Sequence, residues 1–187
     1  MMRKTRPHAA MAALSLLLVA LPATAHKSVQ LGVDRFASQP PDWAKGKRIG
    51  VLTNDGALDS QGVPVADRLS RVAALKVTSF FAPEHGLAAD KQGTIGDEQR
   101  NGIPIYSLYG TRKAPSDEQF KGIDLLVCDL PDVGARFYTF ASSMSLSMQA
   151  AKKAGKRFVV LDRPNPINGT QLEGPILQPA HFSFVGL

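Results

Sequence analysis

The feature that most constrains the fold of this chain is a series of short apolar segments separated by helical patterns. The segments are rich in β-branched and aromatic residues, and each is stopped by Asn, Asp or Pro; they span 48–54, 76–81, 124–130 and 157–161. Runs of this length, bounded by turn residues, are typical of buried strands. Strands that alternate with helices imply right-handed crossovers. The sequence therefore predicts an α/β fold with a mainly parallel, doubly wound sheet.

Three helices are predicted between these strands. Residues 64–73 place apolar side chains at helical spacing, and Ser116 with Gln119 forms a capping box for a short helix. The longest helical pattern, 137–154, carries lysines in its last turn and is stopped by Gly155. The remaining segments have weaker patterns. Residues 27–47 contain a short packed piece of undetermined type, 87–103 form a polar loop, and 104–109 form a strand or extended piece.

The first 25 residues have the pattern of a secretory signal peptide. A basic start (Arg3, Lys4, Arg6) precedes an apolar run at 9–21 and the small-residue motif that ends at Ala25. We expect cleavage after Ala25 and a secreted, periplasmic domain at 26–187, with no stable membrane insertion after cleavage. An uncleaved N-terminal anchor is the alternative. The three basic residues account for half of the formal net charge of +6, so the composition gives no indication of a nucleic-acid partner.

Polar side chains follow the predicted strands at the point where each strand ends. The carboxyl ends of parallel strands share one edge of a sheet, which is where ligands bind in open α/β folds. We therefore expect these residues to converge on one crevice. They are Asn54, Glu84, Asp129 with Asp132, and Asp162 with Arg163.

The segment FFAPEHG at 80–86 presents the strongest candidate for catalysis. Pro83 ends the strand and Gly86 permits a sharp turn, so Glu84 and His85 are presented at the sheet edge. Paired carboxyl groups that flank a bond are the usual apparatus of glycoside hydrolysis. The alternative is that Glu84 caps the following turn and His85 packs beside it.

Other classes of site have no support in the sequence. It contains no GxGxxG or GxxxxGK[ST] motif, no HExxH motif and no clustered histidines, so we expect neither a cofactor nor a metal. The single cysteine, Cys128, lies in an apolar run and is interpreted as a buried, inert thiol. Arg136 falls at the start of the predicted helix 137–154, where a cation opposes the helix dipole. Either an anionic ligand or an internal pair with Asp132 would account for it.

The chain resembles the DUF1343 family, whose characterised members are the NamZ-type exo-β-N-acetylmuramidases of glycoside hydrolase family 171. The motifs that carry the resemblance are KGKRIGVLTN, FFAPEHG, GIPIYSLYG, DVGARFYTF, VLDRPNPING and EGPIL, in this order. The resemblance implies a Rossmann-like N-terminal domain and a smaller C-terminal domain with the active cleft between them. It also implies release of N-acetylmuramic acid from the non-reducing ends of peptidoglycan fragments during cell-wall turnover.

The resemblance also implies roles for individual residues. Glu84 would be the catalytic carboxylic residue, with His85 beside it, and Arg136 would bind the lactyl carboxylate of muramic acid. The residues expected to line the sugar site are Asn54, Tyr109, Asp132, Arg136, Tyr138, Asp162, Arg163 and Asn165.

The chain departs from the family pattern in three places. TNDGALD replaces a TNxTG-like turn after the first strand, Pro131 replaces a polar residue before DVGAR, and the sequence ends at SFVGL. We expect the family's C-terminal domain to be missing, and apolar surface to be exposed around Phe182, Phe184 and Val185. A non-catalytic remnant that binds sugar or is inactive is therefore the alternative to a working glycosidase domain.

Overall fold

The computed structural model describes residues 29–93 and 95–187. Within this range the chain forms one six-stranded sheet in the order β3-β4-β2-β1-β5-β6. The strands are β1 Arg48–Leu52, β2 Lys76–Ala82, β3 Glu98–Arg100, β4 Ile103–Ser107, β5 Leu125–Cys128 and β6 Arg157–Val160. All adjacent strands are parallel except β3 and β4, which pair antiparallel at one edge. The predicted doubly wound α/β fold is confirmed, and the predicted signal peptide lies outside the described residues.

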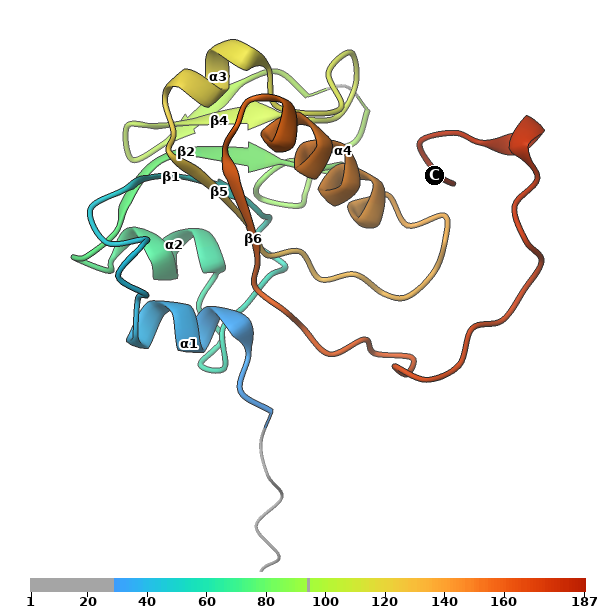
Figure 1. The fold of residues 1–187 in the computed structure, drawn as a ribbon, viewed down its shortest axis with the longest axis horizontal. Coiled ribbons are helices and arrows are strands. Elements are labelled where there is room, and N and C mark those ends of the chain that lie inside the picture. The colour runs from blue at the N-terminus through green and yellow to red at the C-terminus, as the bar shows by residue number, and fades with distance from the viewer. Residues whose placement is uncertain (1–28, 94) are drawn as a thin grey trace, which may run out of the picture.

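Helices cover both faces of the sheet (Figure 1). On one face, α1 Gly32–Ser38 and α2 Val65–Ser70 share an apolar cluster with Ile49 and Val51 of β1. On the other face, α3 Asp117–Lys121 and α4 Phe140–Lys153 share a second cluster with Leu52. Successive β1 side chains point to opposite faces of the sheet, so this strand contributes to both apolar clusters. In the strand order, β1 lies between β2 and β5, near the centre of the sheet.

Gly50 is required at the centre of β1 because a bulky ring occupies the space beside it. A Cβ atom at this position would lie 2.7 Å from Cε2 of Phe81 and 3.0 Å from Cδ1 of Ile123. Both of these side chains are fully buried in the cluster beneath α3 and α4. Glycine therefore allows the Phe81 ring of β2 to pack directly against the β1 backbone.

The structure corrects the sequence analysis in three elements. The helix predicted at 137–154 begins at Phe140, because residues before it form a turn in which the Tyr138 amide donates to the Ala135 carbonyl at 2.9 Å. The segment 27–47, for which no type of structure was predicted, contains α1. The segment 87–103, which was predicted to be a loop, contains the short strand β3. The capping box of α3 is confirmed, with Ser116 and Gln119 each bonding the other's backbone amide.

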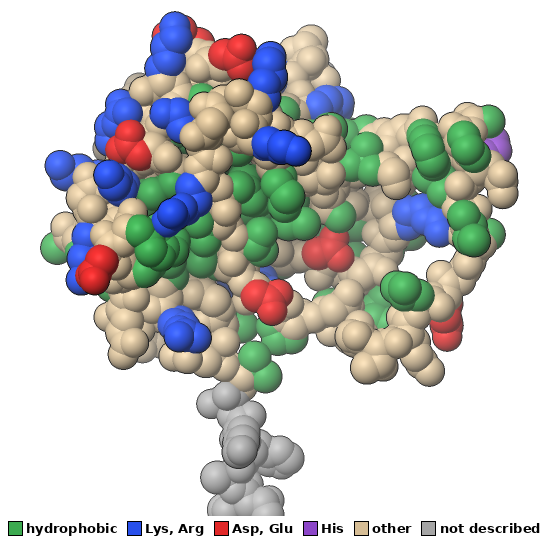
Figure 2. Space-filling model, viewed as in Figure 1, with side chains coloured by type: hydrophobic (Ala, Val, Ile, Leu, Met, Phe, Trp, Pro, Cys, Tyr) green, Lys and Arg blue, Asp and Glu red, His purple; other side chains and the backbone are tan. Residues whose placement is uncertain are grey.

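The chain after β6 forms an extended arm with little regular structure. It leaves the sheet, curves away from the body and returns toward the N-terminal end of α4 (Figure 1), with only the short 3₁₀ helix η1 Pro179–His181. Figure 2 shows an opening between this arm and the body. The expectation of exposed apolar surface holds for Phe182 and Val185, whereas Phe184 is half-buried because it packs against Tyr109, with ring centroids 6.2 Å apart.

Candidate active site

The candidate active site is built where β2 ends. Pro83 follows the strand, and its carbonyl accepts a hydrogen bond of 3.1 Å from the Gly86 amide, which closes a turn around Glu84 and His85. His85 and Gly86 both have left-handed backbone conformations, with φ of 71° and 77°. A left-handed residue other than glycine is uncommon, and such strain gathers at functional sites. The turn thus holds Glu84 at the carboxyl edge of the sheet, as predicted.

Glu84 is held by residues that come from distant parts of the chain. The Thr139 hydroxyl, at the N-cap of α4, donates a hydrogen bond of 2.7 Å to Oε2 of Glu84. Burial raises the pKa of Glu84, but hydrogen bonding from Tyr109 and Thr139 and the charges of His85 and Lys113 outweigh it, so the net pKa is lowered. The N-terminus of α4 also favours a negative charge. The lowered pKa keeps Glu84 ionised at neutral pH. In the described part of the chain no backbone amide donates to its side chain, so Glu84 does not cap the turn that follows it.

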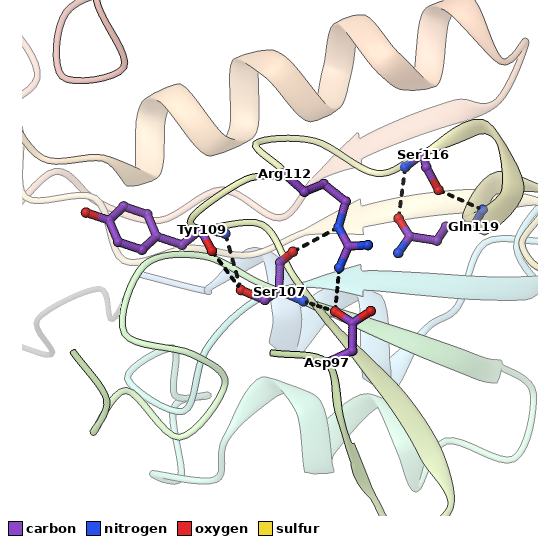
Figure 3. A network of polar contacts seen from close by, with 6 residues as sticks. All are labelled: Asp97, Ser107, Tyr109, Arg112, Ser116 and Gln119. Atoms are coloured by element: carbon purple, nitrogen blue, oxygen red, sulfur yellow. Dashed lines mark hydrogen bonds and ion pairs between the residues drawn. The ribbon is translucent and has the colours of Figure 1, made fainter. Parts of the chain in front are cut away.

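Tyr109 is positioned by a polar network that joins the loop after β4 to Asp97, the residue before β3 (Figure 3). Asp97 accepts hydrogen bonds from the Ser107 amide, at 2.9 Å, and from the Arg112 guanidinium. Arg112 also donates to the Ser107 carbonyl at 3.1 Å, and the Tyr109 amide donates to Oγ of Ser107 at 3.3 Å. In Figure 3 the Tyr109 ring points away from this network. Its interaction with Glu84 raises the pKa of the phenol.

His85 is exposed, and its ring is oriented by the loop that follows. Nδ1 lies 2.9 Å from the Lys91 carbonyl oxygen. A carbonyl can only accept a hydrogen bond, so Nδ1 carries a proton, and in the neutral ring Nε2 is the basic nitrogen. His85 acts on Glu84 through its charge, which lowers the pKa of Glu84.

A second group of predicted residues lines a pocket of about 310 Å³ between the end of β6 and the start of α4. Asp132 reaches it from the segment after β5, and Asp162, Arg163 and Asn165 reach it from the segment after β6. Phe140 and Ala141 of α4 form an apolar wall. Because Phe140 follows Thr139 directly, the first turn of α4 connects this pocket to the Glu84 group.

Arg163 has a structural role at the edge of this pocket. Its guanidinium pairs with Asp129, which is 1% exposed, and donates to the Leu58 carbonyl at 2.8 Å. Burial raises the pKa of Asp129 to about 6, while Arg163 opposes that shift. The pair ties the segment after β6 to the end of β5 and to the loop after β1. These bonds use Nε and Nη2 of Arg163, which leaves Nη1 as the part of its side chain most available to a ligand.

Three other predicted residues lie outside the two groups. Asn54 is buried, and its Oδ1 has no hydrogen-bond partner among the residues that the structure describes. Tyr138 packs edge-on against Phe140, with ring centroids 4.7 Å apart. Arg136 donates to the Pro175 carbonyl on the arm.

One of the two sequence-based explanations for Arg136, the internal pair with Asp132, is wrong, and the other, an anionic ligand, stays a prediction. The helix dipole argument fails because α4 begins at Phe140, beyond the turn that contains Arg136. An internal pair with Asp132 is not formed within residues 29–93 and 95–187; Oδ1 of Asp132 instead accepts a hydrogen bond of 2.7 Å from the Gly134 amide. Oδ2 of Asp132 is buried and has no partner in the described part of the chain.

The sequence analysis missed Thr139 and Lys113. Thr139 occupies the N-cap position of α4, but its hydroxyl makes no capping hydrogen bond, and its bond to Glu84 depends on tertiary structure. Lys113 lies with Nζ 4.3 Å from the centroids of Tyr109 and of Phe184. Nothing in the local sequence distinguishes it from a surface lysine.

Across the described ranges, no three or more His, Cys, Asp or Glu side chains are grouped so that they could hold a metal ion. No helix in the described part of the chain has the length and apolarity needed to cross a membrane. Cys128 is buried, and burial raises the pKa of its thiol, as expected of an inert residue.

The fold and site define a Rossmann-like α/β protein with an acidic site at the carboxyl edge of its sheet. The family model described as "Exo-beta-N-acetylmuramidase NamZ, N-terminal" matches residues 49–187, and the chain belongs to this family. The chain is 44% identical over 165 residues to the peptidoglycan β-N-acetylmuramidase NamZ of Bacillus subtilis (strain 168), a match that covers 85% of this chain and 39% of that protein.

Solved structures give the same result. Two crystal structures of DUF1343 family proteins from Bacteroides fragilis NCTC 9343 are similar to this chain. The first has a TM-score of 0.77 at 36% identity, and the match covers 84% of this chain and 40% of that protein's chain. The second has a TM-score of 0.68 at 33% identity, and the match covers 83% of this chain and 40% of that protein's chain. The chain thus spans about two fifths of the length of these relatives.

Proposed function

We propose that this chain is the Rossmann-like part of an exo-β-N-acetylmuramidase that releases N-acetylmuramic acid from the non-reducing ends of peptidoglycan fragments. The observation that carries the proposal is the Glu84 carboxylate, which a strained turn presents at the sheet edge and which accepts a hydrogen bond of 2.7 Å from the Thr139 hydroxyl. The sequence similarity to a peptidoglycan β-N-acetylmuramidase supplies the substrate class.

The charge state of Glu84 indicates which catalytic roles it can perform. An ionised carboxylate can attack the anomeric carbon or take a proton from water, but it cannot protonate the departing sugar oxygen. In its ionised form, Glu84 therefore suits the role of nucleophile or general base. Another group must act as the acid, unless bound sugar raises the pKa of Glu84 by displacing water from it.

The pocket beside α4 is the proposed place for further parts of the sugar. Asp132, Asp162 and Asn165 line it with hydrogen-bonding groups, and Phe140 gives it an apolar wall. Pockets of this kind, mostly apolar with a few polar groups, are usual for small ligands. Asp132 is a candidate for contact with a sugar hydroxyl, since its buried Oδ2 has no hydrogen-bond partner in the described part of the chain.

The test is hydrolysis of a chromogenic N-acetylmuramide by residues 26–187, compared with the same residues fused to the remaining part of a longer relative. We expect turnover by the fusion and little or none by residues 26–187, because a site open to water loses the groups that orient the sugar and exclude solvent. Equal turnover by both would show that this chain holds a complete site. If the sugar binds but neither protein turns it over, the chain is a binding module and the proposal is wrong.

We also propose that the protein is exported and acts in the periplasm, where peptidoglycan fragments are produced. The support is the signal-peptide pattern that ends at Ala25. N-terminal sequencing of exported protein should give a chain that begins at His26. A periplasmic protein that begins at Met1 would contradict cleavage.

A further inference from the structure

Lys113 is the least expected member of the Glu84 group. It lies in the loop between β4 and α3, and its Nζ is 4.3 Å from the ring centroids of both Tyr109 and Phe184. Tyr109 belongs to the same loop, whereas Phe184 belongs to the arm after β6. A cation within about 6 Å of a ring centroid is attracted to the face of the ring. The amine is therefore held by two aromatic side chains, one of which, Tyr109, also interacts with Glu84.

The charge of Lys113 is not neutralised by a nearby carboxylate. Its neighbour Arg112 forms an ion pair with Asp97. Within residues 29–93 and 95–187, no carboxylate oxygen lies within 4.0 Å of Nζ of Lys113, and its influence on Glu84 acts over a longer distance. Lys113 is half-buried, and its position is defined by rings that contribute no opposing charge.

Lys113 is better placed than Arg136 to meet an anion bound at Glu84. The charged groups that act on Glu84 are His85 and Lys113. Arg136 is exposed and donates to the Pro175 carbonyl on the arm. A sugar with its anomeric carbon at Glu84 carries the ether at C3 on the same ring, so a substituent at C3 remains within the surroundings of Glu84.

We propose that Lys113 recognises the lactyl carboxylate of muramic acid and so selects muramic acid over glucosamine. This inference rests on the proposed function. The ammonium group would donate a charge-assisted hydrogen bond to the carboxylate, an interaction about twice as strong as one between neutral groups. Tyr109 and Phe184 would hold the amine in place before the sugar binds, which reduces the entropy lost on binding.

The experiment is an NMR titration of the chain with three sugars: N-acetylmuramic acid, its lactyl methyl ester, and N-acetylglucosamine. The ester keeps the shape of the substituent without its charge, and N-acetylglucosamine lacks the substituent. We expect the chain to bind N-acetylmuramic acid about tenfold or more tightly than either neutral sugar, the usual effect of a hydrogen bond to a charged group.

Two variants separate the charge of Lys113 from its packing. Lys113→Met keeps a flexible apolar chain against both rings, and we expect it to bind all three sugars with similar affinity. Lys113→Arg keeps the charge and should retain most of the preference. The control is Lys121→Met, which removes a lysine that pairs with Glu118 on α3; the preference for N-acetylmuramic acid should be unchanged.

The outcomes distinguish failure of this inference from failure of the proposed function. If Lys113→Met keeps the full preference for N-acetylmuramic acid over its ester, Lys113 does not recognise the carboxylate, and the proposed function stands. If Lys113→Met lowers the affinity for all three sugars by the same factor, Lys113 has only a structural role and the inference is wrong. If the fusion of this chain to the remaining part of a longer relative binds none of the sugars, both the inference and the proposed function are overturned.

Discussion

Thr139 donates its hydroxyl proton to Glu84 across 2.7 Å, although the two residues are 55 positions apart in the chain. The bond connects the first turn of the longest helix to the end of β2. It places the carboxylate at the positive end of a helix dipole, where a negative charge is stabilised. The charge state of Glu84 thus depends on the packing of α4 against the sheet as well as on the local turn.

Replacing Thr139 by valine tests this connection. The substitution preserves the shape of the side chain and removes the hydroxyl, so the ionised form of Glu84 loses a hydrogen bond and its pKa should rise. The measurement is a pH titration of the Glu84 carboxyl carbon by NMR. Thr139→Ser keeps the hydroxyl and should leave the pKa nearly unchanged. An unchanged pKa in Thr139→Val would show that the hydroxyl does not stabilise the carboxylate.

Replacing Glu84 by glutamine tests its catalytic role in a fusion that turns over muramides. The change removes the titrating carboxyl group with little change in volume, and we expect kcat to fall by ~10²–10⁴-fold. Circular dichroism and thermal unfolding should show that the fold is kept. A variant with more than about a tenth of the original kcat, well short of the loss expected for a general acid or base, would make Glu84 structural. Asp132 and Asp162 would then be the next candidates.

Two aspartates at opposite ends of β5 should affect stability with opposite dependence on pH. Burial raises the pKa of Asp129 from 3.8 to about 6, so between these values the native state binds more protons than the unfolded state. The contribution of Asp129 to the free energy of unfolding therefore falls as pH rises from about 4 to about 6. Arg48 lowers the pKa of Asp124 to about 2, so the contribution of Asp124 is lost as pH falls from about 4 to about 2.

The measurement is the free energy of unfolding as a function of pH for the native sequence and for Asp129→Asn and Asp124→Asn. Asparagine keeps an acceptor oxygen for Arg163 or Arg48, so the variants isolate the titration. The free energy of unfolding of the native sequence minus that of Asp129→Asn should decline as the pH rises from about 4 to about 6. A difference that rises over that interval would mean that Arg163 outweighs the effect of burial.

Replacing Gly50 by alanine should destabilise the fold without direct effect on the site. The new Cβ would lie 2.7 Å from the Phe81 ring in a fully buried cluster, and overpacking of this kind typically costs about 1–3 kcal/mol. Thermal or urea unfolding measures the change. Gly169→Ala is the matched control, because an added Cβ there meets no atom within 4 Å. Equal stability of the two variants would show that the Phe81 ring moves aside at no cost.

The sequence predicted the parts of the fold that depend on local pattern. Apolar runs predicted the strands of the parallel sheet, and the spacing of Ser116 and Gln119 predicted the start of α3. The start of α4 was misplaced because Phe137 and Tyr138 continue the apolar pattern, whereas in the structure Phe137 is exposed and the helix begins after the Thr139 cap. Strand β3 was missed because its residues, Glu98–Arg100, are polar and lie at an edge that does not need apolar side chains.

The site was predictable to the extent that it follows from the ends of strands. Glu84 and Asp162 lie where parallel strands end, as the alternation of elements requires. The partners of Glu84 could not be derived in this way, since Thr139 and Lys113 reach it from a helix cap and a loop. The helix start expected at Arg136 was wrong, because Phe137 and Tyr138 continue the apolar pattern whereas α4 begins at Phe140.

The contact between Phe184 and Tyr109 has a practical consequence for handling the protein. Phe184 is close to the C-terminal end of the printed sequence and packs beside the candidate active site. An affinity tag attached after Leu187 would therefore begin a few residues after Phe184, whose ring lies 4.3 Å from Nζ of Lys113, and would compete with ligands for this surface. A removable tag placed before the mature domain avoids this. By the same geometry, any polypeptide that continues past Leu187 starts a few residues after Phe184, so the length and stiffness of that joint determine what can reach the surface around Tyr109.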